Sequence, residues 1–153
     1  MIDTRVRAVI IEKDQILLIK RIKKESTYWV LPGGGVEEGE SHEETVIREC
    51  QEELGVEVLV EKYFDKVETV YLGKEQENIF FICKIIGGKV GTGVGPEYQE
   101  GDYYEGEHIP EWMSMEEFEE NIILPEGIKE KILKIFGQKH QMFQETGLGS
   151  KDF

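Results

Sequence analysis

The stretch that decides the fold runs from residue 31 to residue 56 and reads LPGGGVEEGESHEETVIRECQEELGV. Proline and three consecutive glycines at 32–35 suit neither a helix nor a regular strand, so they predict an irregular loop. Residues 41–54 then turn to a helical pattern, and Ser41 followed by Glu44 matches a capping box at its start. Gly55 stands where a helix stop is expected. The sequence therefore predicts a glycine loop that leads directly into a capped helix.

Three glutamates fall on one face of this predicted helix. At 100° per residue, placing Glu49 at zero puts Glu53 at about 40° and Glu52 at about −60°. Like charges at this spacing destabilise a helix by about 0.2–0.5 kcal/mol per pair. Converging carboxylate oxygens suit Mg²⁺ or Mn²⁺, although a solvated acidic face is the commoner meaning of such a run. The preceding loop favours a metal site, because Gly33–Gly35 let the backbone approach a ligand closely and Glu40 follows at the helix start.

The composition of the whole chain limits the classes of function. Its 153 residues carry 32 acidic and 18 basic side chains, and a net charge of −14 argues against non-specific nucleic-acid binding. A bound phosphate ester would need a cation to offset the repulsion, with acidic residues as ligands of that cation. The apolar runs are too short to span a bilayer, and nothing at the N-terminus marks the chain for export. Cys50 and Cys83 lie within apolar patterns, which indicates reduced thiols in a cytoplasmic protein.

The rest of the sequence predicts one α/β domain over 1–137 and a polar, loose tail over 138–153. Strands are expected at 5–11 and 16–21 as a hairpin-like pair, and at 28–31, 56–63, 67–72, 78–86 and 108–113. A glycine-rich loop is expected over about 87–106, and helices at 115–120 and at 126–136, the latter ended by Gly137. The apolar face of 126–136 is either core or a homodimer contact.

The segment 34–56 resembles the Nudix box, in the order Gly34, five residues, Glu40, seven residues, then Arg48-Glu49-Cys50-Gln51-Glu52-Glu53-Leu54-Gly55-Val56. Every fixed glycine, glutamate and arginine stands at its spacing, and Cys50 occupies a position where that family usually has a bulky aliphatic residue. The resemblance implies an α/β/α sandwich with a mixed sheet and flanking helices. It also implies a MutT-like, metal-dependent hydrolase of a nucleoside diphosphate linked to a group X, which releases a nucleoside monophosphate and phospho-X.

The resemblance also implies roles for individual residues. The implied metal ligands are Glu49, Glu52, Glu53 and the backbone carbonyl of Gly33. Glu40 is similar to the family's supporting acid, and Arg48 would orient the glutamates through bidentate ion pairs. The proton of the attacking water would go to Glu52, to Glu53 or to an acid of a later loop. Among the acids of that loop Glu97 is the choice, with a solvated loop acid as the alternative.

Candidates for substrate binding extend beyond the box; they are Arg21, Gly34 and Gly35. Arg21 ends the second predicted strand at a position that is often basic in the family, where it either contacts a phosphate or protects a sheet edge. Arg5 and Arg7 alternate on the first predicted strand and can contribute as well. Tyr28 and Trp29 either stack on a base or are half-buried strand aromatics.

The expected partner is a small soluble nucleotide, without a membrane or stable nucleic-acid contact. The box specifies the reaction, and no motif of the sequence identifies X. A nucleotide-sensing domain that binds without cleavage is the alternative function, and a structural acidic domain is a third.

Overall fold

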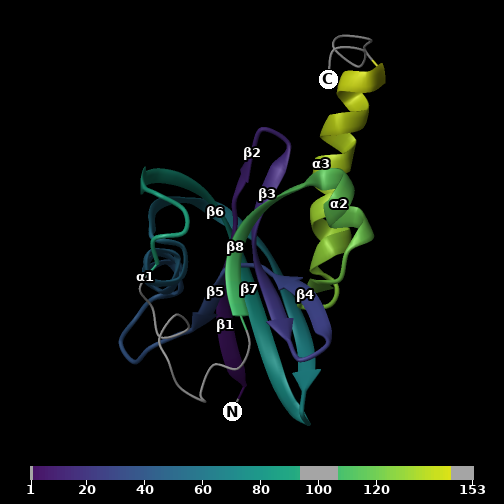
Figure 1. Ribbon diagram of the computed structural model, residues 1–153. Helices are drawn as coiled ribbons and strands as arrows, with labels where there is room; N and C mark the ends of the chain where they lie inside the picture. The colour runs from purple at the N-terminus through teal and green to yellow at the C-terminus, as the bar shows by residue number, and fades with distance from the viewer. Residues whose placement is uncertain (1, 94–106, 146–153) are drawn as a thin grey trace.

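Two β-sheets form the centre of the computed structural model, which describes residues 2–93 and 107–145, with side chains for all of these except Tyr71 and 137–145 (Figure 1). The first sheet has the order β5-β1-β7-β6, formed by Gly33–Gly35, Asp3–Val9, Lys74–Gly88 and Val56–Tyr71. The second joins β2, β3, β4 and β9, formed by Ile11–Glu12, Gln15–Lys23, Ser26–Val30 and Ile123–Leu124. Strand β8, Glu107–Ser114, pairs with β3.

Helices cover both sides of these sheets. Helix α1, His42–Leu54, lies on one side, and α2, Met115–Glu120, and α3, Ile128–Glu145, lie on the other (Figure 1). The pairing is mixed, because β1 runs parallel to β7 and antiparallel to β5. The predicted α/β/α class is therefore confirmed. In the described part of the chain no helix is long and apolar enough to cross a membrane.

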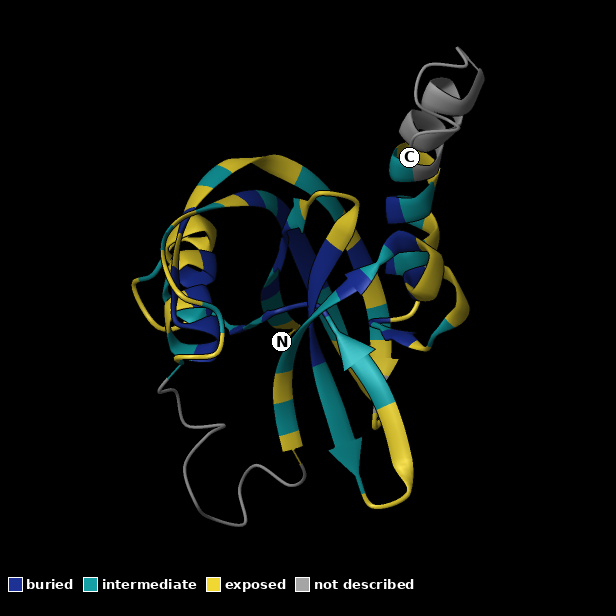
Figure 2. Cartoon of the chain, turned by 45° about the horizontal axis from the view of Figure 1, so that its top comes forward, coloured by how far each residue is buried: buried dark blue, intermediate teal, exposed yellow. Residues whose placement is uncertain are grey.

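Two clusters of buried apolar side chains hold the layers together. The first packs Val46, Cys50 and Leu54 of α1 against β1, β3, β6 and β7. Figure 2 accordingly shows α1 buried along the face turned to the sheets and exposed on the other. The second cluster includes Ile128 and Ile132 of α3. Part of the apolar face of α3 is thus used in the core, while Ile135 of the same helix is 48% exposed.

The predicted pairing of the first two strands is confirmed next to the turn, where β2 and β3 form an antiparallel hairpin, and is wrong for the rest of the first strand. Residues 5–11 are divided between β1 and β2, and only β2 pairs with β3, with Ile11 opposite Ile16. Strand β1 instead lies beside β7, with Arg7 opposite Phe80. A short polar turn between two aliphatic runs favours a hairpin locally, but a parallel partner many residues away cannot be identified from local pattern.

The three glycines form strand β5, although the sequence predicted an irregular loop. β5 pairs antiparallel with β1, with Gly33 opposite Arg7 and Gly35 opposite Arg5. Gly33 has a φ of 150°, and a Cβ at this position would overlap the Val6 carbonyl oxygen. Glycine is therefore required for the strand to approach β1 this closely.

The bounds of three further elements differ from the prediction. β6 is one strand over 56–71 rather than two, because register shifts near Val60 and Tyr63 bend it without ending it. β7 begins at Lys74 rather than at 78. Helix α3 begins at Ile128 and continues through Gly137 to Glu145, so that part of the predicted loose tail is helical. A glycine costs a helix only about 1 kcal/mol and does not by itself end it.

Candidate active site

Helix α1 is fixed at both ends by the signals that the sequence predicted. Ser41 accepts a hydrogen bond from the Glu44 N–H at 3.1 Å, and the Glu44 carboxylate accepts one from the Ser41 N–H at 2.9 Å. At the other end Gly55 adopts the left-handed conformation with a φ of 78°. A capping box and a glycine C-cap together satisfy end groups that would otherwise fray. The acidic face of α1 is therefore held in a defined place.

Arg48 is the centre of the polar network on this face. Its Nη1 donates to Glu49 at 3.0 Å and to Glu52 at 2.9 Å. Its Nε and Nη2 donate to the two carboxylate oxygens of Glu40 at 2.7 and 3.0 Å. Nη2 also donates to the Gly35 carbonyl oxygen at 3.0 Å, which ties the helix to β5. One planar guanidinium thus orients three carboxylates and the glycine strand, a geometry that lysine cannot reproduce.

Glu40 is the most firmly held carboxylate of the network. Its hydrogen bonds with Arg48 are joined by one from the Thr45 hydroxyl at 2.8 Å. Hydrogen bonding by Arg48 lowers the pKa of Glu40 from about 4.5 to about 2. The same bond, with the charges of the neighbouring glutamates, raises the pKa of Arg48. Thr45 is fully buried, and the sequence analysis did not assign it a role.

The pKa of Glu40 predicts a pH-dependent contribution to stability. Because the pKa is lower in the folded state, the ionised carboxylate stabilises the fold above pH 4.5, and this contribution is lost between pH 4.5 and about 2. We expect Glu40→Gln to lower Tm by about 5 °C at pH 7, and by progressively less at pH 4 and pH 3. Thermal unfolding followed by circular dichroism measures this. A Tm difference that stays constant with pH would contradict the charge-based explanation, and Glu43→Gln on the exposed first turn is the control.

Glu53 lies deeper than the other glutamates of α1. Its side chain is 7% exposed, and its Oε1 accepts a hydrogen bond from the Gly33 N–H at 2.9 Å. Gly34, the next residue of β5, stands against Glu49, since a Cβ there would lie 2.5 Å from Glu49 Oε1. The absence of a side chain at Gly34 thus leaves room for the Glu49 carboxylate beside the strand.

The chemistry of this donor set fits a hard divalent cation. Three carboxylates from one helix face lie beside a glycine strand, and carboxylate oxygens are the ligands that Mg²⁺ and Mn²⁺ prefer. Within the residues that the structure describes, no three His, Cys, Asp or Glu side chains already have the close grouping of a metal site. Arg48 occupies part of the acceptor capacity of Glu49 and Glu52.

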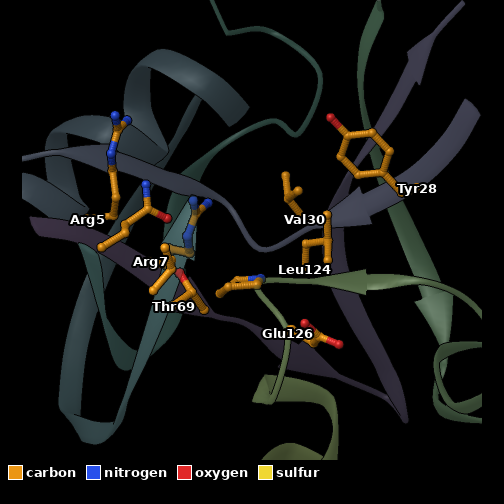
Figure 3. A pocket seen from close by; sticks show the side chains of 10 residues that line it. Arg5, Arg7, Tyr28, Val30, Thr69, Leu124 and Glu126 are labelled. Carbon is orange, nitrogen blue, oxygen red and sulfur yellow. The ribbon is translucent and has the colours of Figure 1, made fainter. Parts of the chain in front are cut away.

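A pocket of about 400 Å³ opens between strands of the two sheets (Figure 3). Strands β1, β4, β6, β7 and β9 contribute to its lining, which comprises Arg5, Arg7, Tyr28, Val30, Thr69, Val70, Gln76, Leu124, Pro125 and Glu126. Burial lowers the pKa of Arg7, and the charge of Glu53 opposes that shift. Arg7 is therefore near enough to the acidic face to interact with it electrostatically.

A model of the NUDIX domain matches residues 1–136 of the chain. The chain belongs to the Nudix family. An ADP-ribose pyrophosphatase from Methanocaldococcus jannaschii is 36% identical over 111 residues, which are 66% of this chain and 61% of that protein. A putative 8-oxo-dGTP diphosphatase from Bacillus subtilis is 53% identical over 47 residues, 31% of this chain and 30% of that protein. The aligned part thus spans less than two thirds of either relative.

A solved NUDIX hydrolase from Nitrosomonas europaea shares the fold, with a TM-score of 0.71 at 20% identity and with 91% of both chains covered. The resemblance seen in the sequence is therefore confirmed as family membership. Nudix hydrolases act on small nucleotides and generally use divalent metal ions.

The structure brings most of the predicted Nudix site residues together. Glu40, Arg48, Glu49, Glu52 and Gly35 share one hydrogen-bonded network, and Glu53 joins Gly33 beside it. Glu97 and most of the predicted loop over 87–106 lie outside the described residues.

The Nudix helix packs its apolar side chains against the sheets. Val46, Cys50 and Leu54 are fully buried, whereas Ile47 is 40% exposed. Burial raises the pKa of Cys50 well above its ordinary value, so this residue is a packed apolar side chain rather than a nucleophile. Cysteine thus fills the position where the family usually has an aliphatic residue without adding a reactive group.

The predicted substrate contact Arg21 is not among the residues that line the pocket. Its guanidinium carbon stands 5.9 Å from the centroid of the Tyr28 ring, and Tyr28 is the residue that lines the pocket. Of the weaker candidates, Arg5 and Arg7 do reach the lining. Thr69 and Gln76 also line the pocket but were not predicted; they come from strands β6 and β7, far along the chain. The alternation of side chains along these strands is visible in the sequence, whereas the strand order that brings the two residues to the pocket is not.

Proposed function

We propose that this protein hydrolyses the pyrophosphate bond of a nucleoside diphosphate linked to a group X, releasing a nucleoside monophosphate and phospho-X. The observation that carries the proposal is the Arg48 network, which gathers Glu40 and the α1 residues Glu49 and Glu52 against the glycine strand β5, with Glu53 bonded to Gly33 beside it. A cluster of like charges costs stability, so its retention beside a pocket is typical of a functional site. The names of the relatives, a pyrophosphatase and a diphosphatase, support the same reaction class.

The proposed metal ligands are Glu49, Glu52, Glu53 and the Gly33 carbonyl. A bound Mg²⁺ or Mn²⁺ supplies charge neutralisation at the phosphoryl oxygens and lowers the pKa of water. Arg48 keeps the glutamates in position, and Gly34 and Gly35 leave space for a phosphate to approach the backbone. Glu52, Glu53 or Glu97 accepts the proton of the water that attacks phosphorus in line. Arg21, which lies against Tyr28 of the pocket lining, is a further proposed substrate contact.

The experiment that tests this function is a substrate panel assayed with Mg²⁺ and with Mn²⁺ in H₂¹⁸O. Nucleoside triphosphates, ADP-ribose and other nucleotide sugars, and dinucleoside polyphosphates are each scored by their products. We expect a nucleoside monophosphate and one ¹⁸O atom on a single phosphoryl product. Saturable binding of nucleotides without any product would instead support a sensing domain.

Free, buried Cys50 and Cys83 support a reducing compartment, and we propose that the enzyme acts in the cytoplasm. This assignment makes soluble nucleotides its natural substrates. Fractionation of the native host, with the protein recovered among reduced cytoplasmic proteins, tests it.

Because Gly34 stands directly against Glu49, a substitution at Gly34 should weaken metal binding while leaving the stability of the fold nearly unchanged. In Gly34→Ala the new methyl group would displace the flexible end of Glu49, so we expect an affinity for Mn²⁺ about tenfold weaker. Tm should change by no more than about 4 °C, because a side-chain terminus rather than backbone must move. Isothermal titration calorimetry measures the affinity. Gly35→Ala is the matched control, since its Cβ would meet no atom closer than 3.9 Å.

A further inference from the structure

A continuous network of hydrogen-bonded side chains on β1 and β7 supports one wall of the pocket, which is lined by Arg5, Arg7 and Gln76 of this network. Arg5 Nε and Gln76 Nε2 both donate to Asp3 Oδ2, at 3.1 and 3.2 Å. The buried Asn78 donates through Nδ2 to Gln76 Oε1 at 3.3 Å and accepts from Arg7 Nε at 3.0 Å. The pairing of Asp3 with Gln76 and of Arg5 with Asn78 in the parallel register explains why these groups meet. These hydrogen bonds fix which way the side-chain amides of Gln76 and Asn78 point.

Arg7 lies at one end of this hydrogen-bonded network, and its guanidinium is bonded to two different partners. Besides its bond to Asn78, its Nη1 donates to the Leu31 carbonyl oxygen at 2.9 Å. Within residues 2–93 and 107–145, no hydrogen bond uses the remaining nitrogen, Nη2. Figure 3 shows the guanidinium directed into the pocket from β1, with Tyr28 approaching from the β4 side. Arg7 is thus a pre-positioned donor at the pocket wall.

Arg7 also stands next to the acidic face. It lies opposite Gly33 in the β1–β5 register, and the Gly33 N–H donates to Glu53. A ligand with a phosphate at the glutamates therefore extends its next groups past Arg7. The opposite wall is an aromatic and apolar surface of Tyr28, Val30 and Leu124, which suits the flat face of a ring.

We propose that this pocket takes the base of the nucleotide and that Arg7 selects bases that present a carbonyl oxygen, with guanine favoured over adenine. Guanidinium supplies donors only, so the edge that it contacts must be made of acceptors, as O6 and N7 of guanine are. Adenine places an amino donor beside N7 and is best read by a free amide. Both amides of the wall, Gln76 and Asn78, are already bonded to neighbours. The carboxylate of Glu126 points away from Arg7 (Figure 3).

This inference rests on the proposed function for the direction in which the nucleotide lies, but binding alone can test it. Calorimetry with GMP and AMP in EDTA measures base preference without turnover. We expect GMP to bind about tenfold more tightly than AMP, and the ratio to fall close to one in Arg7→Gln. Arg7→Lys, which keeps the charge without the guanidinium plane, should give an intermediate ratio. Lys62→Gln, which removes a positive charge from the exposed face of β6, is the control.

The outcomes separate this inference from the proposed hydrolysis. A wild-type ratio of one, a preference for AMP, or no binding of either nucleotide would overturn base selection by Arg7. An unchanged preference in Arg7→Gln with a Tm like that of wild type would also overturn it. If Arg7→Gln does not fold, the wild-type ratio and Arg7→Lys still decide. GMP preference without cleavage of any nucleotide would leave base selection standing and remove the hydrolase function.

Discussion

Replacing Glu53 by glutamine should abolish turnover while leaving the fold intact. Glutamine keeps an oxygen that can accept the Gly33 N–H bond, so the tie between α1 and β5 survives. It removes the negative charge from a side chain that is only 7% exposed and lies at the proposed metal site. Loss of a metal-ligating or proton-accepting carboxylate costs about 10²–10⁴ in rate, and we expect kcat to fall by at least about 10³. Product release under saturating Mg²⁺ and substrate measures this.

The matched control is Glu43→Gln, the same substitution in the exposed first turn of the same helix. Its kcat should equal that of wild type. Tm of Glu53→Gln should stay within about 4 °C of wild type, since removing one of several like charges relieves repulsion. Phosphate or nucleotide release at the wild-type rate in Glu53→Gln would show that the reaction occurs elsewhere.

Replacing Arg48 by alanine should lower both stability and activity. The change removes the only guanidinium that contacts Glu40, Glu49 and Glu52 in the described residues and leaves those carboxylates without their cation. Breaking a buried ion pair costs about 3–5 kcal/mol, and since Arg48 is 23% exposed we expect about 2–3 kcal/mol. Tm should fall by about 5–10 °C. We expect kcat to fall about 10²-fold, because the glutamates lose their orientation.

Arg48→Lys distinguishes the effect of the positive charge at position 48 from the effect of the planar guanidinium. Lysine restores a positive charge but not the planar fork, so stability should recover in part while kcat stays low. Lys131→Ala, which breaks the exposed pair with Asp65, is the control for ion-pair loss in general and should cost less than about 1 kcal/mol. Wild-type stability and kcat in Arg48→Ala would contradict the central role of the network.

The parts of the site that the sequence predicted are those encoded locally. Ser41, Glu44 and Gly55 specify the ends of α1, and the spacing of Glu49, Glu52 and Glu53 follows from helical geometry alone. The role of Arg48 was implied by the resemblance to the Nudix box, and one of its partners, Glu52, lies one turn away on the same helix. Local signals of this kind do not depend on how the rest of the chain is arranged.

The parts that the sequence could not predict depend on strand partners. Gly33–Gly35 form a strand only because β1 lies beside them. β1 in turn pairs with β7 rather than with β3, which is nearer in the sequence. The same arrangement puts Arg7 rather than Arg21 in the pocket lining and adds Gln76 from β7. Register between distant strands is set by the packing of whole faces, which a single sequence does not display.

The direct pairing of β5 with β1 fixes the spacing between Gly33 and Arg7. Gly33, which touches Glu53, and Arg7 are partners in one register, so neither can shift along its strand without breaking the ladder between them. In the proposed binding mode, the distance between the phosphate at Glu53 and the group held at Arg7 is therefore set by this pairing. That mode predicts that the cleaved bond lies at a constant distance from the end held at Arg7, and that changes to the far side of X do not alter this distance.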